Sequence, residues 1–411
     1  MKQFFNEFAA SIDTYIMFKI KEKMNLLYDE LTKKNRKPIS LAMGAPTTPP
    51  PSRLIEDFKN LLDDKSIHTY SVPKGEKYLV DAIKLRMKNR FNVDIETTEI
   101  CSLLGSKEGI ANLIRGIITP TSNDSDKDII LIPDPSYASY KEMVKVCGGM
   151  GYSVPLTAKN NYMPDMEEIL QELKKEGYNK DRIKALIINY PNNPLGATCT
   201  KEYLEKVVNF CKKHEILLIS DAAYVDIYFD EKDKPHSVLE ISGAKDISVE
   251  FHSFSKPYSI TGWRIGWICG NREVVSQFAK LKSTIDSGIF KGIQKACADI
   301  LNTKEGNDYI VWANNEIKKK SDYFVNAFKN ELGWEIDHIP SATFYQWIKV
   351  PSRYSTSEEF CNDILTKSGI VMVPGTAFGK YGQGYVRVSI VCSIEELQEV
   401  VKRMKEDGFT Y

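Results

Sequence analysis

One lysine in the sequence stands among side chains that could make its amine a nucleophile. Lys256 follows an apolar run, residues 247–254, that is typical of a buried strand. Ser253 and Ser255 place hydroxyls beside it, and Arg264 follows eight positions later. A nearby arginine and partial burial both lower the pKa of an amine, which favours Schiff-base chemistry with an aldehyde. A solvated loop lysine is the plainer interpretation, and it fits most of the other lysines.

Further polar groups follow apolar runs that we expect to be parallel strands. Asp221 and Tyr224 come after residues 216–220, and Asn193 lies in the turn Asn-Asn-Pro-Leu-Gly that follows residues 183–189. An aspartate at such a place is often only a helix cap, and Asn-Pro-x-Gly forms a turn without any ligand. The ends of parallel strands meet at one edge of a sheet, however, so these groups are expected to lie near the lysine.

Two basic segments are candidates for binding anions. Gly-Ser-Lys-Glu-Gly, residues 105–109, follows an expected strand and opens an expected helix, where backbone N–H groups can bind phosphate. Ser106 would add a hydroxyl, although a glycine turn into a helix is also common without a ligand. Because no Gly-Lys-Ser/Thr pattern follows, the segment is not a P-loop. Arg387 alternates with apolar residues in Tyr-Val-Arg-Val-Ser-Ile, where an edge-strand arginine facing water is the simpler interpretation.

These motifs together resemble a known enzyme family. Ser-x-Ser-Lys, followed by Gly-Trp-Arg with the arginine eight residues after the lysine, resembles the cofactor-lysine signature of class I/II aminotransferases. These are pyridoxal-phosphate enzymes of fold type I. Ser-Phe-Ser-Lys and Gly-Ser-Lys-Glu-Gly further resemble the branch that holds LL-diaminopimelate, aspartate and alanine aminotransferases. Six elements follow the family's order over about residues 40–390, while the segment Met-Gly-Ala-Pro near the N-terminus departs from it.

The resemblance implies roles for the residues around the cofactor ring. Lys256 would hold pyridoxal phosphate covalently and act as general acid and base. Asp221 would keep the pyridine nitrogen protonated; at 3–4 Å this contributes on the order of 4–5 kcal/mol at an effective dielectric constant of ~20. Tyr137, in Pro-Ser-Tyr, would stack on the ring. Asn193 and Tyr224 would share the ring oxygen.

The resemblance also implies contacts for the phosphate and the substrate. The phosphate would be bound by Ser106, Lys107, Ser253, Ser255 and Arg264. Tyr70, with a glycine five positions on, matches a tyrosine that reaches the phosphate of the neighbouring subunit, which implies a homodimer with shared active sites. The substrate would be bound by Gly44, Asn193 and Arg387, the last gripping the α-carboxylate with its planar fork.

The implied activity is ping-pong transfer of an amino group between an L-amino acid and a 2-oxo acid. A carbon–sulfur β-lyase, or another fold type I enzyme, would use the same cofactor ligands and stays open as an alternative. A dinucleotide-binding enzyme is disfavoured because no Gly-x-Gly-x-x-Gly follows an expected strand. A non-catalytic regulator is disfavoured because no basic helix-turn-helix segment is visible.

Composition narrows the remaining classes. The 411 residues carry 55 basic and 55 acidic side chains, so no net charge points to nucleic acid. Eight cysteines form no Cys-x-x-Cys pair and do not cluster with the five histidines, so we expect no metal site. The sequence begins without a signal-peptide pattern and has no apolar run of membrane-spanning length. We therefore expect a cytoplasmic protein without a membrane partner.

The periodicity predicts an α/β fold: a mostly parallel, seven-stranded type of sheet between helices, with a smaller α+β domain. Expected strands of the large sheet are 99–104, 128–132, 183–189, 216–220, 247–253 and 264–269. Expected helices are 106–118, 137–146, 165–176, 201–213, 271–302 (kinked or divided at Gly288 and Gly292) and 308–330. We expect three segments: 1–45, an arm and helix belonging to the small domain; 46–305, the large cofactor-binding domain; and 306–411, the small domain.

Overall fold

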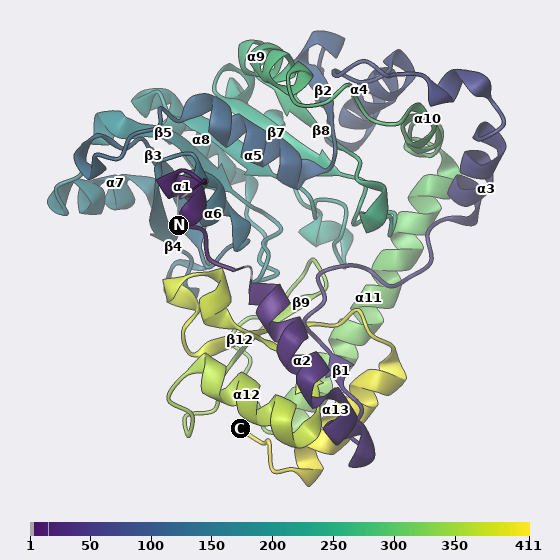
Figure 1. Cartoon of the computed structure of the whole chain (residues 1–411), viewed down its shortest axis with the longest axis vertical. Coiled ribbons are helices and arrows are strands. Elements are labelled where there is room, and N and C mark those ends of the chain that lie inside the picture. The colour runs from purple at the N-terminus through teal and green to yellow at the C-terminus, as the bar shows by residue number, and fades with distance from the viewer. Residues whose placement is uncertain (1–3, 15) are drawn as a thin grey trace.

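The large sheet dominates the chain, which the computed structural model describes over residues 4–14 and 16–411. Figure 1 shows this helix-covered sheet above a smaller C-terminal region. Its strands are β2 (Ile100–Leu103), β3 (Ile129–Asp134), β4 (Met150–Pro155), β5 (Ile183–Ile188), β6 (Leu217–Asp221), β7 (Ser248–Ser253) and β8 (Gly266–Gly270). They lie in the order β2-β8-β7-β6-β5-β3-β4, and only the pairings of β8 with its two neighbours are antiparallel.

Helices cover both faces of this sheet because its strands alternate apolar side chains between two cores. Leu218 packs into one core and its neighbour Ile219 into the other. The first core is covered by α3 (Ser52–Leu61), α4 (Lys77–Phe91), α7 (Met166–Lys175), α8 (Lys201–His214) and α10 (Lys291–Ile300). The second core is covered by α5 (Ser106–Ile117), α6 (Ser139–Val146) and α9 (Arg272–Ser283). The expected fold class is therefore confirmed.

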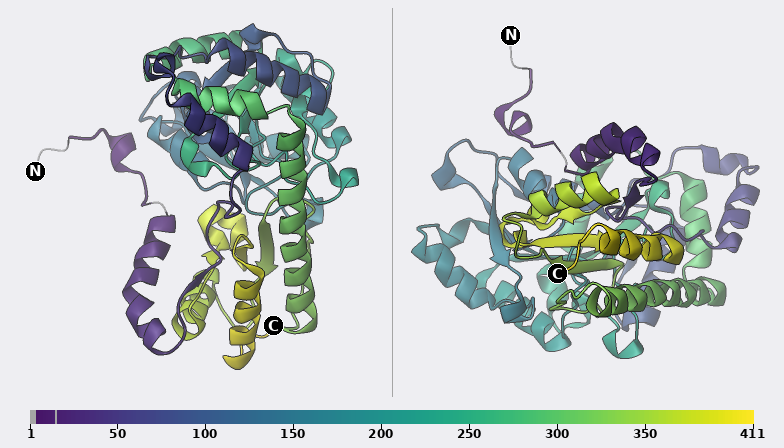
Figure 2. Two further views of the ribbon diagram at one scale, coloured as in Figure 1. Left: turned by 90° about the vertical axis from the view of Figure 1, so that its right-hand side faces the viewer. Right: turned by 90° about the horizontal axis from the view of Figure 1, so that it is seen from below.

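The smaller C-terminal region is built on a three-stranded antiparallel sheet. Its strands are β9 (Tyr345–Lys349), β11 (Val373–Pro374) and β12 (Tyr385–Ser389), with β12 in the middle. Its helices are α11 (Lys304–Asn330), α12 (Ser357–Ser368) and α13 (Ile394–Glu406), and two 3-10 turns, Gly375–Phe378 and Lys380–Gly382, precede β12. Figure 2 shows α2 (Ile16–Lys33) beside α12, with α11 on the other side of the sheet.

Part of the N-terminal segment joins this region rather than the large sheet. Strand β1 (Ile39–Ser40) pairs in parallel with β10 (Ile370–Val371), and Leu31 of α2 packs with Leu365 of α12. The short helix α1 (Glu7–Ala10) instead contacts α6 of the large region. The N-terminal segment thus touches both regions.

Some expected boundaries are corrected by the structure. Strand β4 was not expected; it lies at the sheet edge, is mostly half-buried and contains Gly151, so it lacks the apolar run that marked its neighbours. Arg264, expected to open a strand, lies in a turn with φ +56°, and β8 begins two residues later. By contrast, the division expected within residues 271–302 is confirmed: the segment forms α9 and α10, with Gly288 (φ +94°) between them. Gly292 lies inside α10.

Two further observations concern the whole described chain. None of the helices in residues 4–14 and 16–411 is long and apolar enough to cross a membrane. All eight cysteines fall within these residues, and each is free.

Candidate active site

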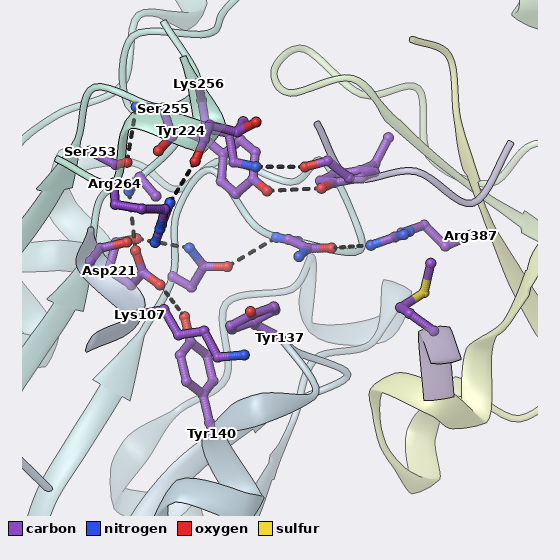
Figure 3. Close-up of a pocket in the computed structure, with 18 residues that line it drawn as sticks. Lys107, Tyr137, Tyr140, Asp221, Tyr224, Ser253, Ser255, Lys256, Arg264 and Arg387 are labelled. Atoms are coloured by element: carbon purple, nitrogen blue, oxygen red, sulfur yellow. Dashed lines mark hydrogen bonds between the residues drawn. The ribbon is translucent and has the colours of Figure 1, made fainter. Parts of the chain in front are cut away.

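A cavity of about 290 Å³ lies where the large sheet faces the C-terminal region. It opens at the carboxyl ends of β3, β5, β6 and β7, the edge at which ligands bind in parallel sheets. Figure 3 shows the labelled side chains entering it from both regions. Its lining residues are Met17, Gly44, Ser106, Lys107, Tyr137, Tyr140, Asn189, Asn193, Asp221, Ala223, Tyr224, Ser253, Ser255, Lys256, Thr261, Arg264, Tyr345 and Arg387.

Lys256 lies on the turn that follows β7, and its amine points into the cavity (Figure 3). Its Nζ donates to the main-chain oxygen of Gly44 at 2.5 Å and lies 5.5 Å from the ring centre of Tyr224. Burial, together with the charges of Arg387 and Arg264, lowers the pKa of Lys256 to about 8. About a tenth of this amine is therefore unprotonated at pH 7, far more than for a lysine with the ordinary pKa of 10.5, and a nucleophile requires the unprotonated form.

Asp221, the last residue of β6, is buried, and its carboxyl group lines the cavity. Its Oδ2 accepts from the hydroxyl of Tyr140 at 2.5 Å, and its Oδ1 accepts from the backbone N–H of Ala223 at 3.2 Å. Burial raises the pKa of Asp221, while these two donors and the nearby His252 and Lys256 lower it. A buried carboxylate with few partners favours a cationic ligand next to it.

Another part of the cavity can bind an anion with several oxygens. Helix α5 begins at Ser106, which lines the cavity, and the first backbone N–H groups of a helix have no partner within the helix and can bind an anion. Gly105 has φ +89°, and a Cβ there would lie 2.2 Å from Arg264 Nη2, so only glycine permits this approach. Ser255 Oγ is buried with no hydrogen-bond partner within the described chain. Arg264 donates to the main-chain oxygens of Thr261 and Leu104, at 2.8 and 3.2 Å.

Arg387 is a buried cation on β12, the middle strand of the small sheet. Its Nη1 donates to Asn193 Oδ1 at 3.0 Å and its Nη2 to the main-chain oxygen of Ala42 at 2.6 Å. Among the described residues, its Nε has no hydrogen-bond partner, and its Nη1 and Nη2 donate to neutral oxygens rather than to a carboxylate. The guanidinium lies 4.5 Å from the ring centre of Tyr345. Burial excludes the solvated edge-strand alternative, and the unpaired charge favours a ligand carboxylate.

Aromatic side chains form the walls between these charged groups. Tyr137 precedes α6 and packs edge-on against Tyr140, with 5.6 Å between the ring centres. The hydroxyls of Tyr224 and Tyr345 are 2.8 Å apart, and burial raises the pKa of Tyr224, so its hydroxyl stays protonated. Lys107 Nζ lies 5.7 Å from the ring centre of Tyr137.

The cavity brings together every site residue expected from the sequence except Tyr70. Tyr70 is 87 % exposed and lies in a separate shallow depression with residues 68–71 and 287–290. It therefore takes no part in the cavity of its own chain.

Six cavity residues were missed by the sequence analysis. A usable signal existed for two of them: Tyr140 lies one helical turn after Tyr137, and Asn189 ends the expected strand 183–189. Asn189 Nδ2 donates to the main-chain oxygen of Asp221 at 2.8 Å. The others are Met17, Ala223, Thr261 and Tyr345.

Comparison with known proteins shows the family to which this chain belongs. The sequence profile described as "Aminotransferase class I and II" matches residues 36–404. The chain belongs to the class I and II aminotransferase family. It is 37% identical to the LL-diaminopimelate aminotransferase of Nitratidesulfovibrio vulgaris, covering 89% of this chain and 90% of the relative. It is also 37% identical to the LL-diaminopimelate aminotransferase of Aquifex aeolicus, covering 95% and 99%.

Solved structures of aminotransferases share its fold. Substrate-bound BacF from Bacillus subtilis superimposes with a TM-score of 0.89 at 29% identity, covering 98% of each chain. The aspartate aminotransferase of Thermotoga maritima gives a TM-score of 0.85 at 28% identity, covering 98% and 99%. The protein is thus a pyridoxal-phosphate-dependent aminotransferase whose substrates are amino acids and 2-oxo acids. The expected family, fold, cofactor and amino-group transfer are confirmed.

The residues of the cavity fit pyridoxal phosphate. The start of α5, Arg264 and the partnerless hydroxyl of Ser255 form a cradle suited to a phosphate. The buried carboxylate of Asp221 suits a cationic pyridine nitrogen, and the Lys256 amine suits an aldehyde. The phosphate, the ring nitrogen and the aldehyde of the cofactor therefore each have a matching protein group at the cavity wall.

Proposed function

We propose that Lys256 binds pyridoxal phosphate as a Schiff base and then moves the proton of the substrate's α-carbon. The single observation that carries this proposal is the amine of Lys256, which lies in the cavity with its pKa lowered to about 8. When bound, the cofactor supplies an aldehyde for the substrate amine and a ring that withdraws the electron pair left by the departing proton. At neutral pH, Lys256 Nζ can both accept and return that proton, as an acid–base catalyst should.

Asp221 and its neighbours are proposed to hold the charge on which this chemistry depends. Asp221 would stay ionised against a cationic ring nitrogen, supported by the hydroxyl of Tyr140 at 2.5 Å. Tyr137 is proposed to lie against the ring face, and Asn193 and Tyr224 to bind the ring oxygen. The proposed phosphate ligands are Ser106, Lys107, Ser253, Ser255 and Arg264.

Arg387 is proposed to bind the α-carboxylate of the substrate, with Gly44 and Asn193 beside it. The support is that a buried guanidinium without a carboxylate partner lies on the side of the cavity opposite the phosphate cradle (Figure 3). A substrate carboxylate would supply the missing anion. Donor amino acid and acceptor 2-oxo acid would bind here in turn, which gives ping-pong kinetics.

We further propose that the preferred amino acids carry a second carboxylate. Lys107 adds positive charge beside Tyr137, and the cavity lining holds four cations, Lys107, Lys256, Arg264 and Arg387, against one carboxylate, Asp221. A bound phosphate and one α-carboxylate would balance most of this charge, so the support for a second carboxylate comes mainly from the related proteins. The relatives named LL-diaminopimelate aminotransferase point to the same class of substrate.

Half-reaction spectra would test this proposal. Holoenzyme is mixed with LL-diaminopimelate, L-aspartate, L-glutamate, L-alanine or L-phenylalanine, and conversion of the cofactor to its amine form is followed by absorbance. The proposal predicts conversion by the first three at lower concentrations than by the last two. An equal response to all five would contradict a requirement for a second carboxylate. Release of pyruvate and ammonia from L-cysteine, without glutamate formation from 2-oxoglutarate, would favour the β-lyase alternative.

The remaining expectations concern assembly and location. We propose a homodimer in which Tyr70, exposed on its own chain, reaches the cofactor phosphate of the neighbouring subunit. We propose the division into residues 1–45, 46–305 and 306–411, supported by the pairing of β1 with β10 and by a core cluster drawn mostly from the C-terminal region. A cytoplasmic location is proposed from the free cysteines, since thiols persist in reducing compartments.

A further inference from the structure

A carboxylate outside the cavity joins the two regions of the chain that form it. Asp134 is the last residue of β3, and its side chain is completely buried. Two of its donors come from the large region: Lys141 Nζ at 2.7 Å and Ser153 Oγ at 2.8 Å. The other two are backbone N–H groups of the C-terminal region, those of Lys380 at 3.3 Å and Tyr381 at 3.1 Å.

The approach between the two regions at this point is unusually close. A Cβ added to Gly379, which has φ +138°, would lie 1.9 Å from Asp134 Oδ1. Any other residue would push the carboxylate away from the turn, so the contact depends on glycine. Two residues along, the backbone N–H of Ser136 donates to the main-chain oxygen of Phe378 at 2.9 Å. Residues 134–136 and 378–381 are therefore tied together by three hydrogen bonds.

Both tied segments carry groups of the active site. On the large-region side, Tyr137 directly follows Ser136 and lines the cavity. On the other side, the ring centre of Phe378 lies 4.7 Å from Arg387 Cζ, and Phe378 packs edge-on against Trp347. The turn thus places the ring of Phe378 against the guanidinium of Arg387, which is proposed to bind the substrate carboxylate.

We propose that Asp134 is a positioning residue for substrate binding, which fastens the turn of residues 375–382 to the end of β3 and so holds Arg387 at the cavity. The inference rests on the role proposed for Arg387 above. A buried carboxylate is costly unless fully hydrogen-bonded, and half of its donors here belong to the opposite region. These hydrogen bonds to Asp134 therefore reduce the conformational freedom of Phe378 and Arg387 before the substrate binds.

Kinetics of Asp134→Ala and Asp134→Asn holoenzymes provide the first test. The alanine variant loses all four acceptor contacts, so we expect the KM of the best amino acid from the half-reaction panel to rise at least about tenfold, with kcat falling less than about threefold. The asparagine variant keeps one acceptor oxygen and the side-chain volume, so we expect a smaller rise. The absorbance of the bound cofactor and its dependence on pH stay as in the wild type, because Asp134 does not line the cavity.

Asp363→Asn is the matched control. Asp363 accepts from Tyr354 Oη at 2.7 Å and pairs with Lys367 at 2.9 Å, but all three residues lie within the C-terminal region. This substitution removes a hydrogen-bonded and ion-paired carboxylate within one region without touching the junction, so the KM stays unchanged. An equal rise of KM in this control would mean that general loosening explains the effect, and the proposal would be overturned.

Hydrogen exchange of the holoenzymes reports the fastening directly. In the wild type, peptides that cover residues 378–384 are expected to exchange slowly at Lys380 and Tyr381; in Asp134→Ala they exchange at least about tenfold faster, while α13 is unchanged. If Asp134→Ala does not fold, Asp134→Asn gives the same comparison with a smaller effect. Unchanged exchange, or faster exchange with an unchanged KM, overturns the proposal. Failure of wild-type holoenzyme to convert any amino acid would refute the proposed function, while the exchange result would still report the contact itself.

Discussion

Removing the hydroxyl of Tyr140 tests how the site keeps the carboxylate of Asp221 ionised. Tyr140→Phe removes the donor that lies 2.5 Å from Asp221 Oδ2 and leaves the ring in place. A hydrogen bond to a charged group contributes about 1.5–3 kcal/mol, which corresponds to roughly one to two pKa units of the group it stabilises. Burial already raises the pKa of Asp221, and the loss of this donor raises it further.

The sign of the effect follows from the need for an ionised Asp221. A higher pKa means that the carboxylate is protonated at a higher pH, so the acid limb of kcat/KM should move upward by about one to two pH units. On this acid limb, kcat/KM should fall roughly tenfold or more below the wild-type value at the same pH, because a smaller fraction of Asp221 is ionised to hold the ring nitrogen protonated.

The assay is a pH profile of kcat/KM, measured together with the absorbance of the bound cofactor. Tyr354→Phe serves as the control, since it removes a hydroxyl that donates to Asp363 at 2.7 Å outside the cavity. The control should leave the profile unchanged. An acid limb at the wild-type position in Tyr140→Phe, with undiminished kcat, would refute the assignment of Asp221 as the charge partner of the ring.

Three further predictions concern groups that bind ligands or change protonation. Arg387→Ala should raise the KM for the amino acid at least about thirtyfold, equivalent to roughly 2 kcal/mol, and steady-state kinetics at saturating 2-oxo acid would show it; a wild-type KM would exclude the carboxylate role. Ser255→Ala should weaken cofactor binding about tenfold in equilibrium dialysis while leaving the apoenzyme equally stable or more stable, because the buried hydroxyl has no partner within the described residues; unchanged affinity would argue against a phosphate contact. The stability of the apoenzyme should rise between about pH 8 and 10.5, because Lys256 has its pKa lowered to about 8 in the fold and the unfolded chain binds more protons in that window. Denaturant unfolding would measure this rise, and Lys256→Met should largely abolish it; a variant with the wild-type slope would show that Lys256 is not the group responsible.

Local sequence signals were enough where a functional residue follows a buried strand directly. Asp221 and Ser253 end strands β6 and β7, and the apolar runs that form these strands also place the two residues at the cavity edge. The same logic extends to Asn193, which lies in a turn of fixed chemistry after β5. For these residues, the local sequence predicts both the strand and the edge of the sheet at which the residue lies.

Local sequence signals did not reveal residues whose place at the site depends on contacts between segments far apart in the chain. Tyr345 and Met17 reach the cavity only because the C-terminal sheet and α2 fold against the large region, and nothing in their local sequences marks this. The role of Asp134 is equally invisible, since its donors at residues 380 and 381 are main-chain groups that carry no sequence identity. Strand β4 was missed because an edge strand with glycine and half-buried side chains lacks a clear apolar pattern.

The central claim is that one particular lysine carries the cofactor. Holoenzyme would be reduced with sodium borohydride, digested, and mapped by mass spectrometry for the peptide that retains the pyridoxyl group. The account predicts a single labelled peptide, with the label on Lys256, and neither label nor turnover in Lys256→Ala. A label on another lysine, or a Lys256→Ala enzyme that keeps both its label and its turnover, would contradict it.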